Sequence, residues 1–129
     1  MHKKLVFSLL LALSCGQVMA EWVKISTSEK SVFYMDSSIS KKVGSNVMIW
    51  LLRDHTSPQY DGTVLSLSSK DQIEVDCNGR RIRRIYSSAH PQRMGQGKPV
   101  HSEHGPMSWN DASPGTLAKR IVDIACANR

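Results

Sequence analysis

The stretch QIEVDCNGRRIRRIY, residues 72–86, predicts two strands and the turn that joins them. Its first half alternates, with Ile73, Val75 and Cys77 on one face and polar residues on the other. The dipeptide Asn78-Gly79 follows, and this pair is the strongest short-range signal for a hairpin turn. We therefore expect an antiparallel strand pair in which Cys77 faces whatever covers the sheet.

Period-two patterns also occur on the N-terminal side of this hairpin. The expected strands are rich in β-branched and aromatic residues and cover 21–26, 31–36, 47–52, 64–77 and 80–86. The run 47–52 is apolar on both faces, which is typical of a central strand. Polar or turn-forming residues predict loops through Lys41, Lys42 and Gly44, over 55–62 and over 87–107. We expect one more short strand near Val100.

The last quarter changes to the period of a helix. Ser113 supplies an N-cap residue and Pro114 a first-turn proline, and residues 116–127 place a wide apolar arc on one side with Cys126 at its edge. A helix this apolar must pack against another element. The prediction is an α+β domain, a single antiparallel sheet with a C-terminal helix packed on one face.

The first 20 residues are typical of a secretory signal peptide. A basic start at 2–4, a short apolar run over 5–13 and small residues at Val18 and Ala20 predict cleavage before Glu21. The run is shorter than the roughly 20 residues that cross a bilayer, and no later stretch approaches that length. We expect an exported protein without a transmembrane span.

Cys15 leaves an alternative open. The sequence Ala12-Leu13-Ser14-Cys15-Gly16 loosely resembles the motif at which bacterial lipoproteins are cut and acylated. A lipid anchor at Cys15 would hold the protein at the outer membrane or the cell surface, whereas simple cleavage leaves it periplasmic or secreted.

The composition describes one small globular domain at 21–129. Of the 129 residues, 40% are hydrophobic and 22% charged, which excludes wholesale disorder. Removing the leader takes away Lys3 and Lys4 and lowers the net charge from +6 to +4. So modest a charge on an exported protein argues against nucleic acid as a partner.

Cys77 and Cys126 are the two cysteines of the mature chain. In an oxidising compartment such a pair indicates a disulfide, since a metal site needs closer and more numerous ligands; the alternative is two unpaired buried thiols. By the chain-entropy relation the bridge contributes ~4 kcal/mol, a large share of the stability of a small domain.

Four arginines in the second strand of the hairpin form a candidate ligand-binding cluster: Arg80, Arg81, Arg83 and Arg84. Guanidinium groups bind sulfates, phosphates and carboxylates through paired hydrogen bonds, so an acidic glycan or another acidic surface is a candidate ligand. Alternation sends Arg81 and Arg83 to one face and the other two to the opposite face. Alternatively, these charges only discourage strand-to-strand aggregation.

A second candidate surface is an apolar row in the central strand. If the helix covers the face that carries Ile49, then Met48, Trp50 and Leu52 lie on the other face, where a single-layer sheet leaves them exposed to solvent. Homodimerisation through this face is the first hypothesis and a protein ligand the second. Alternatively, the loops at 55–62 or 87–105 fold over it.

No catalytic or cofactor motif occurs in the chain. His101 and His104 are spaced for one face of a helix, yet Gly105-Pro106 argues for a surface loop there, so we expect no metal. A Gly-x-Ser-x-Gly elbow is missing, and the two mature cysteines are too far apart in sequence for a Cys-x-x-Cys redox pair. The sequence predicts neither an enzyme nor a bound cofactor.

Several short motifs occur in an order that resembles the surface-adhesin protein E family of exported bacterial proteins. They span nearly the whole mature chain: Trp22, Tyr34-Met35-Asp36, Met48-Ile49-Trp50, Glu74-Val75-Asp76-Cys77, Trp109, Ser113-Pro114-Gly115 and Cys126. The resemblance implies about six antiparallel strands and a C-terminal helix tethered by a disulfide. It also implies an adhesin-like, non-catalytic binding protein; the alternative is a structural periplasmic envelope factor with no host ligand.

Overall fold

A computed structural model describes residues 21–127 of the chain, apart from the side chains of residues 37–40. The expected signal peptide and the alternative acylation site at Cys15 lie outside the described residues.

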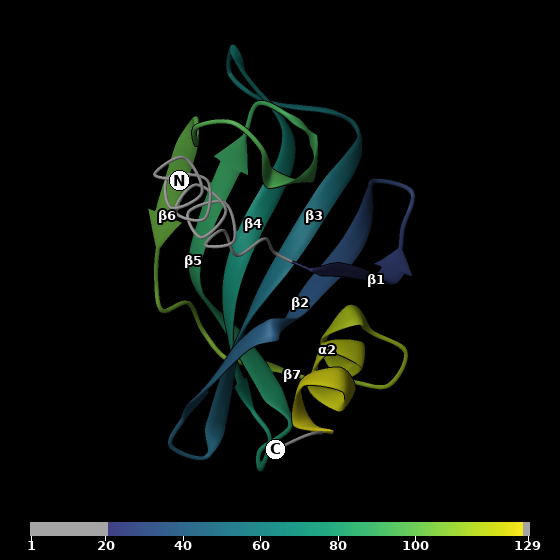
Figure 1. The fold of residues 1–129 in the computed structure, drawn as a ribbon, viewed down its shortest axis with the longest axis vertical. Helices are drawn as coiled ribbons and strands as arrows, with labels where there is room; N and C mark the ends of the chain where they lie inside the picture. Colours follow the sequence, from purple (N-terminus) through teal and green to yellow (C-terminus); the bar gives the residue numbers. More distant parts are fainter. Residues whose placement is uncertain (1–20, 128–129) are drawn as a thin grey trace, which may run out of the picture.

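The described chain is one antiparallel sheet with a C-terminal helix, so the predicted fold class is confirmed (Figure 1). The strands are β1 (Trp22–Thr27), β2 (Ser31–Val43), β3 (Asn46–Asp61), β4 (Val64–Asp76), β5 (Arg81–His90) and β6 (His101–His104), in the order β1-β2-β3-β4-β5-β6. A two-residue strand, β7 (Asn110–Asp111), also pairs with β5. The 3-10 turn η1 covers Arg93–Gly95, and helix α2 covers Leu117–Cys126.

Two strands are longer than the sequence pattern predicts. The expected loop through Lys41 and Lys42 is wrong, because pairing between β2 and β3 resumes there after a register shift between Asp36 and Lys41. The expected loop at 55–62 is also wrong for most of its length, because β3 pairs with β4 again from Gln59. A bulge inserts extra residues into a strand, and pairing continues beyond them. The extra residues break the alternation of polar and apolar side chains, so the sequence pattern does not show that the strand continues.

The hairpin that joins β3 and β4 extends beyond the rest of the sheet at the top of Figure 1. Its tip residues are exposed, including Tyr60 at 68%. This segment therefore projects away from the molecule and does not cover the central strand.

The region from residue 87 to 107 is also more regular than expected. β5 continues to His90, and the expected loop at His101–His104 is an edge strand, β6, paired with β5 between Tyr86 and Ala89. The backbone N–H of Val100 donates to the carbonyl of Ala89 at 2.8 Å, so the short strand predicted near Val100 begins one residue later. This pairing is between segments far apart in the sequence, which local turn propensity does not reveal.

The helix begins later than its expected N-cap. Thr116 is the N-cap, and its side chain accepts a hydrogen bond from the backbone N–H of Lys119 at 3.3 Å. Ser113 and Pro114 lie in the preceding turn, and Gly115 follows with a φ of +78°, outside the helical region. The backbone at Gly115 therefore separates the serine from the helix that it was expected to cap.

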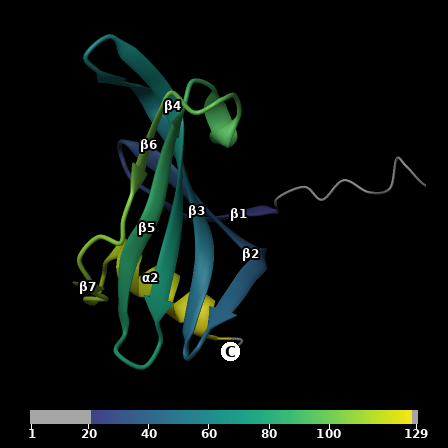
Figure 2. The same cartoon turned by 90° about the vertical axis from the view of Figure 1, so that its left-hand side faces the viewer.

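The core lies between α2 and the sheet. Ile121 and Val122 are 1% and 0% exposed and pack with Ile49, Val75 and other buried residues of the central strands. Cys77 and Cys126 are joined in a disulfide across a sequence separation of 49, as predicted. Figure 2 shows β7 and the first turn of α2 on the left of the sheet and the η1 loop on the right.

Candidate binding surface

The face of the sheet opposite α2 is the candidate functional surface, and we call it the open face. In β3 and β4 the side chains of Ile49 and Ile73 belong to the core under the helix. Because side chains alternate along a strand, Trp50 and Gln72 point to the other side. The open face is thus defined by strand parity across the sheet.

One cross-strand row of the open face reaches all six strands of the main sheet. The register aligns Trp22, Asp36, Trp50, Gln72, Tyr86 and His104. Four of these six positions carry rings, and directly opposed side chains in a sheet are close enough to touch. The open face therefore carries a row of rings interrupted by a carboxylate and an amide.

The rings toward the β6 edge contact one another. Trp50 and Tyr86 meet edge to face, with ring centroids 6.3 Å apart, and Tyr86 lies 4.9 Å from His104. The Tyr86 hydroxyl is 3.1 Å from the Ser102 hydroxyl, within hydrogen-bond distance. Edge-to-face pairs with polar tips give a rigid surface that contacts both apolar and polar groups.

Next to this row lies a cluster of two arginines and a tryptophan. The guanidinium carbons of Arg81 and Arg83 lie 4.4 Å and 4.3 Å from the centroid of the Trp109 ring. Trp109 directly precedes β7, which pairs with β5 at Arg81 and Ile82. The short strand β7 therefore places the ring beside both guanidinium groups, where cation–π attraction holds it.

Carboxylates of β4 balance both arginines. Arg83 Nη2 lies 2.8 Å from Glu74 Oε1, and Arg81 Nε lies 2.8 Å from Asp76 Oδ2. Asn46 Nδ2 donates to the second oxygen of Glu74 at 2.7 Å. These contacts make a polar network on the open face in which each positive charge already has an acidic partner.

The network also holds the carboxylates in their charged form. Burial raises the pKa of Glu74, but hydrogen bonds from Asn46 and Arg83 lower it by more, so that its pKa lies below the ordinary value. The pKa of Asp76 is lowered first by the backbone N–H of Gly79 and then by Arg81. Both ion pairs therefore persist at neutral pH.

The other two predicted arginines lie elsewhere. Arg80 occupies the β4–β5 turn with a φ of +51° and pairs with Asp123 of α2 at 2.5 Å. Arg84 is opposite Ile73 in the register, which places it on the α2 side, and it lies 3.9 Å from Glu103. The structure thus brings together Arg81 and Arg83 and leaves Arg80 and Arg84 outside the cluster.

The expectation that Leu52 is exposed to solvent is wrong. Leu52 is 0% exposed because the η1 loop lies over it, with Gly95 so close that an added Cβ would stand 3.3 Å from Leu52 Cδ1. The loop is held by Met94 N–H donating to Asp54 Oδ1 at 2.9 Å and Gly95 N–H donating to Ser68 Oγ at 2.8 Å. The alternative of a covering loop therefore holds for Leu52, while Met48 and Trp50 remain half-buried.

Sequence reasoning singled out neither Tyr86 nor Trp109 as a surface residue. Strict alternation along β5 puts Tyr86 on the same face as Ile82 and Arg84, and the bulge between Gln72 and Ile73 in the β4–β5 register brings it to the open face instead. Trp109 precedes a strand of only two residues, which is too short for any periodic signal. The resemblance motif that contains Trp109 was the available pointer to it.

Among residues 21–127 there is no group of three or more His, Cys, Asp or Glu side chains placed to hold a metal ion. Within the same range, no helix is long and apolar enough to cross a membrane.

Comparison with known proteins gives one family and one fold. The family model of surface-adhesin protein E matches residues 22–127. Two structures of Haemophilus influenzae protein E are similar in fold, with TM-scores of 0.67 and 0.66. Each is 14% identical to this chain and covers 87% of it, and 91% and 88% of their own chains are covered. Protein E from non-typeable Haemophilus influenzae gives a TM-score of 0.64 at 14% identity, covering 88% of this chain and 80% of that one. The comparison with curated protein sequences finds no significant match.

Proposed function

Because this chain belongs to the surface-adhesin protein E family, we propose that it is an exported, non-catalytic, adhesin-like protein that binds a protein ligand with its open face. A surface-adhesin family implies a protein that reaches the cell surface and has a binding partner. The fold similarity to protein E supports the sheet-and-helix architecture that carries the open face.

The observation that carries the proposal is the composition of the open face next to the β6 edge. Trp50, Tyr86, Trp109, Arg81 and Arg83 come together there, together with Met48. Tryptophan, tyrosine, arginine and methionine are the residue types enriched in protein–protein interfaces, and the first three dominate their binding energy. Because the rings and guanidinium groups already contact one another, they lose little side-chain freedom when a partner binds.

A protein ligand fits this surface better than an acidic glycan. Arg81 and Arg83 are paired with Asp76 and Glu74, so a sulfate or carboxylate would have to compete with two built-in carboxylates. A protein surface can instead pack on the rings and hydrogen-bond the edges of the ion pairs.

In the absence of ligand, we propose that a second copy of the chain occupies the same face. Met48 and Trp50 are half-buried and lie at the centre of the sheet, where a two-fold contact would set this patch against the same patch of the second copy. Ligand and second copy then compete for one surface.

Two binding measurements on purified protein 21–129 test the ligand class. Retention on an immobilised basement-membrane extract should persist at moderate salt, whereas retention on heparin should be weak and unchanged by Arg81→Ser with Arg83→Ser. Arg80→Ser is the matched control, since it removes one charge outside the cluster. Strong, salt-sensitive heparin retention that the Arg81 and Arg83 changes abolish would favour the acidic glycan instead.

Localisation separates the adhesin from a structural periplasmic factor. We expect protease treatment of intact cells to remove the protein, with a periplasmic enzyme as the internal control that stays intact. Protection of both proteins until the outer membrane is opened would support the periplasmic alternative.

A further inference from the structure

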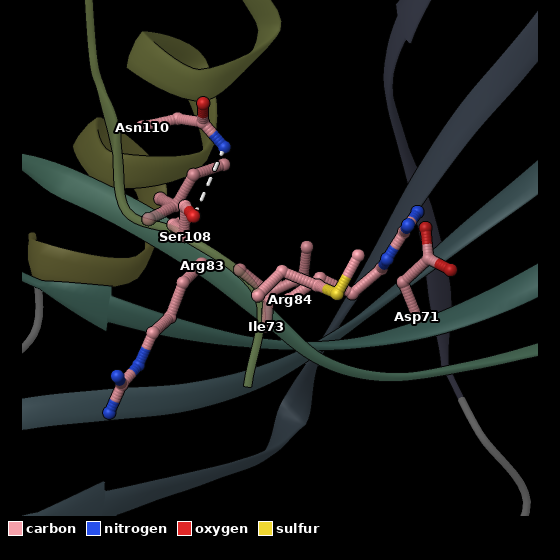
Figure 3. A pocket seen from close by; sticks show the side chains of 8 residues that line it. Asp71, Ile73, Arg83, Arg84, Ser108 and Asn110 are labelled. Atoms are coloured by element: carbon pink, nitrogen blue, oxygen red, sulfur yellow. Dashed lines mark hydrogen bonds between the residues drawn. The ribbon is translucent and has the colours of Figure 1, made fainter. Parts of the chain in front are cut away.

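We propose that a second site, on the α2 side of the sheet, binds a free acyl carboxylate. The site is an open cleft between β5 and the segment that leads into β7, and we call it the Arg84 cleft. Asp71, Ile73, Ile82, Arg84, Met107 and Asn110 line it, around a volume of about 420 Å³ (Figure 3). Clefts of this volume accommodate small molecules.

The floor of the Arg84 cleft is apolar. Ile73 and Ile82 form it where the hydrophobic core ends, and Met107 forms the rim with 47% of its surface exposed. Met107 is fixed in place because its backbone N–H donates to the carbonyl of Arg84 at 2.8 Å. An acyl chain laid over these side chains would remove apolar surface from water on both partners, and each buried methylene strengthens such binding.

Arg84 supplies the polar end of the site. It is 3.9 Å from Glu103, a contact at the outer limit of an ion pair, and both side chains are substantially exposed. Its neighbour Arg83 is by contrast held by Glu74 at 2.8 Å. The guanidinium of Arg84 therefore retains donors for an anion, and a carboxylate matches its paired N–H groups.

The other charged groups around the cleft favour an anion on Arg84 alone. Figure 3 shows Arg84 extended toward Asp71, while Arg83 points away from Ser108 and Asn110. Asp71 is occupied, because Arg53 donates to both of its carboxylate oxygens at 2.9 Å and 3.2 Å and Ser87 donates to one of them at 2.6 Å. Among the described residues, Glu103 is the carboxylate that pairs with Arg84 and would compete with a bound anion.

The Arg84 cleft goes beyond the proposed function, because none of its apolar floor lies on the open face. Ile73 and Ile82 belong to the core side, opposite to Trp50 and Tyr86. Arg83 lines the cleft and also belongs to the open-face cluster, so the variants that separate the two proposals are at Arg84 and Glu103, which lie outside that cluster.

The test is a titration of 13C-methyl-labelled protein 21–129 with decanoate, followed by NMR. We expect the methyl signals of Ile82 and Met107 to shift with saturation, and octanoate to bind severalfold more weakly because two buried methylenes are lost. Acetate should cause no shift at either methyl. If decanoate shifts other methyl signals but leaves those of Ile82 and Met107 unchanged, the proposal is overturned.

Variants separate the charge from the apolar floor. Arg84→Gln should weaken decanoate about tenfold through loss of a charge-assisted contact and leave 1-decanol unchanged. Glu103→Gln removes the competitor and should strengthen decanoate severalfold; this exposed position also keeps the test valid if Arg84→Gln fails to fold. Arg80→Gln is the matched control and should bind as the unchanged protein does. Equal decanoate affinity in the unchanged, Arg84→Gln and Glu103→Gln proteins would refute the assigned role of Arg84.

Discussion

Replacing both bridged cysteines with alanine should cost the domain about 4 kcal/mol of unfolding free energy. The disulfide joins Cys77 and Cys126 across a sequence separation of 49, and a cross-link of that length removes about this much chain entropy from the unfolded state. The loss is a large part of the 5–15 kcal/mol typical of a small domain.

Urea denaturation of protein 21–129 at pH 7.5, followed by tryptophan fluorescence and by far-UV circular dichroism, measures the change. With a slope of about 1.5 kcal/mol/M, the midpoint should fall by nearly 3 M. The slope itself should rise slightly, because the unbridged unfolded chain is more expanded. Unchanged protein treated with reductant is the control and should match the double variant.

The native helix should survive in the double variant at low urea. Ile121 and Val122 stay buried under the sheet whether or not the bridge is present. A double variant within 1 kcal/mol of the oxidised protein would refute the reasoning that the bridge acts on the unfolded chain. So would a variant that unfolds its helix while the sheet remains native.

Three further predictions concern other parts of the molecule. Trp50→Lys should convert a dimer of protein 21–129 into a monomer in light scattering, and an equal mass for both proteins would remove the second-copy proposal. Burial and, after it, the charge of Arg53 lower the pKa of His55 below 6.5, so on acidification the unfolded chain binds the proton at a higher pH than the folded protein does. The stability that the neutral histidine contributes should be complete above pH 6.5 and should be lost as the pH falls through the folded pKa. In His55→Gln this loss should be absent from urea midpoints measured between pH 7.5 and 5.5, whereas parallel curves for the two proteins would contradict the assignment. Gly95→Ala should cost about 2 kcal/mol, because φ is +69° and the new Cβ would meet Lys70 Cδ at 2.8 Å. Gly44→Ala, with φ at +63° and open space around it, should cost about 1 kcal/mol, and equal losses would show that the η1 loop does not press on the sheet.

The architecture was readable where local pattern and tertiary packing agree. The alternation through Ile73, Val75 and Cys77 placed the cysteine on the buried face, and the apolar arc of the last segment placed Cys126 against it. Both patterns arise because one side of the strand or helix is buried, and one-sided burial requires apolar residues at the period of that element.

The sequence reading failed where distant segments pair. Residues at 55–62 look like a turn because Pro58 and Gly62 interrupt the alternation, yet β4 completes the ladder around them. Leu52 looked exposed because nothing local indicates that residues 93–95 fold back over it. The same holds for the contact of Trp109 with Arg81 and Arg83, which depends on a two-residue strand.

The location of the binding surface can be tested directly by comparing variants of the two faces in one assay. Protein 21–129 carrying Trp109→Ala or Tyr86→Ser would be compared with Lys119→Ala, an outward position of α2, for retention on immobilised basement-membrane extract, with thermal unfolding as the check on folding. We predict at least a tenfold loss for both sheet variants and unchanged retention for Lys119→Ala. Folded sheet variants that are retained like the unchanged protein would contradict the assignment of binding to the open face.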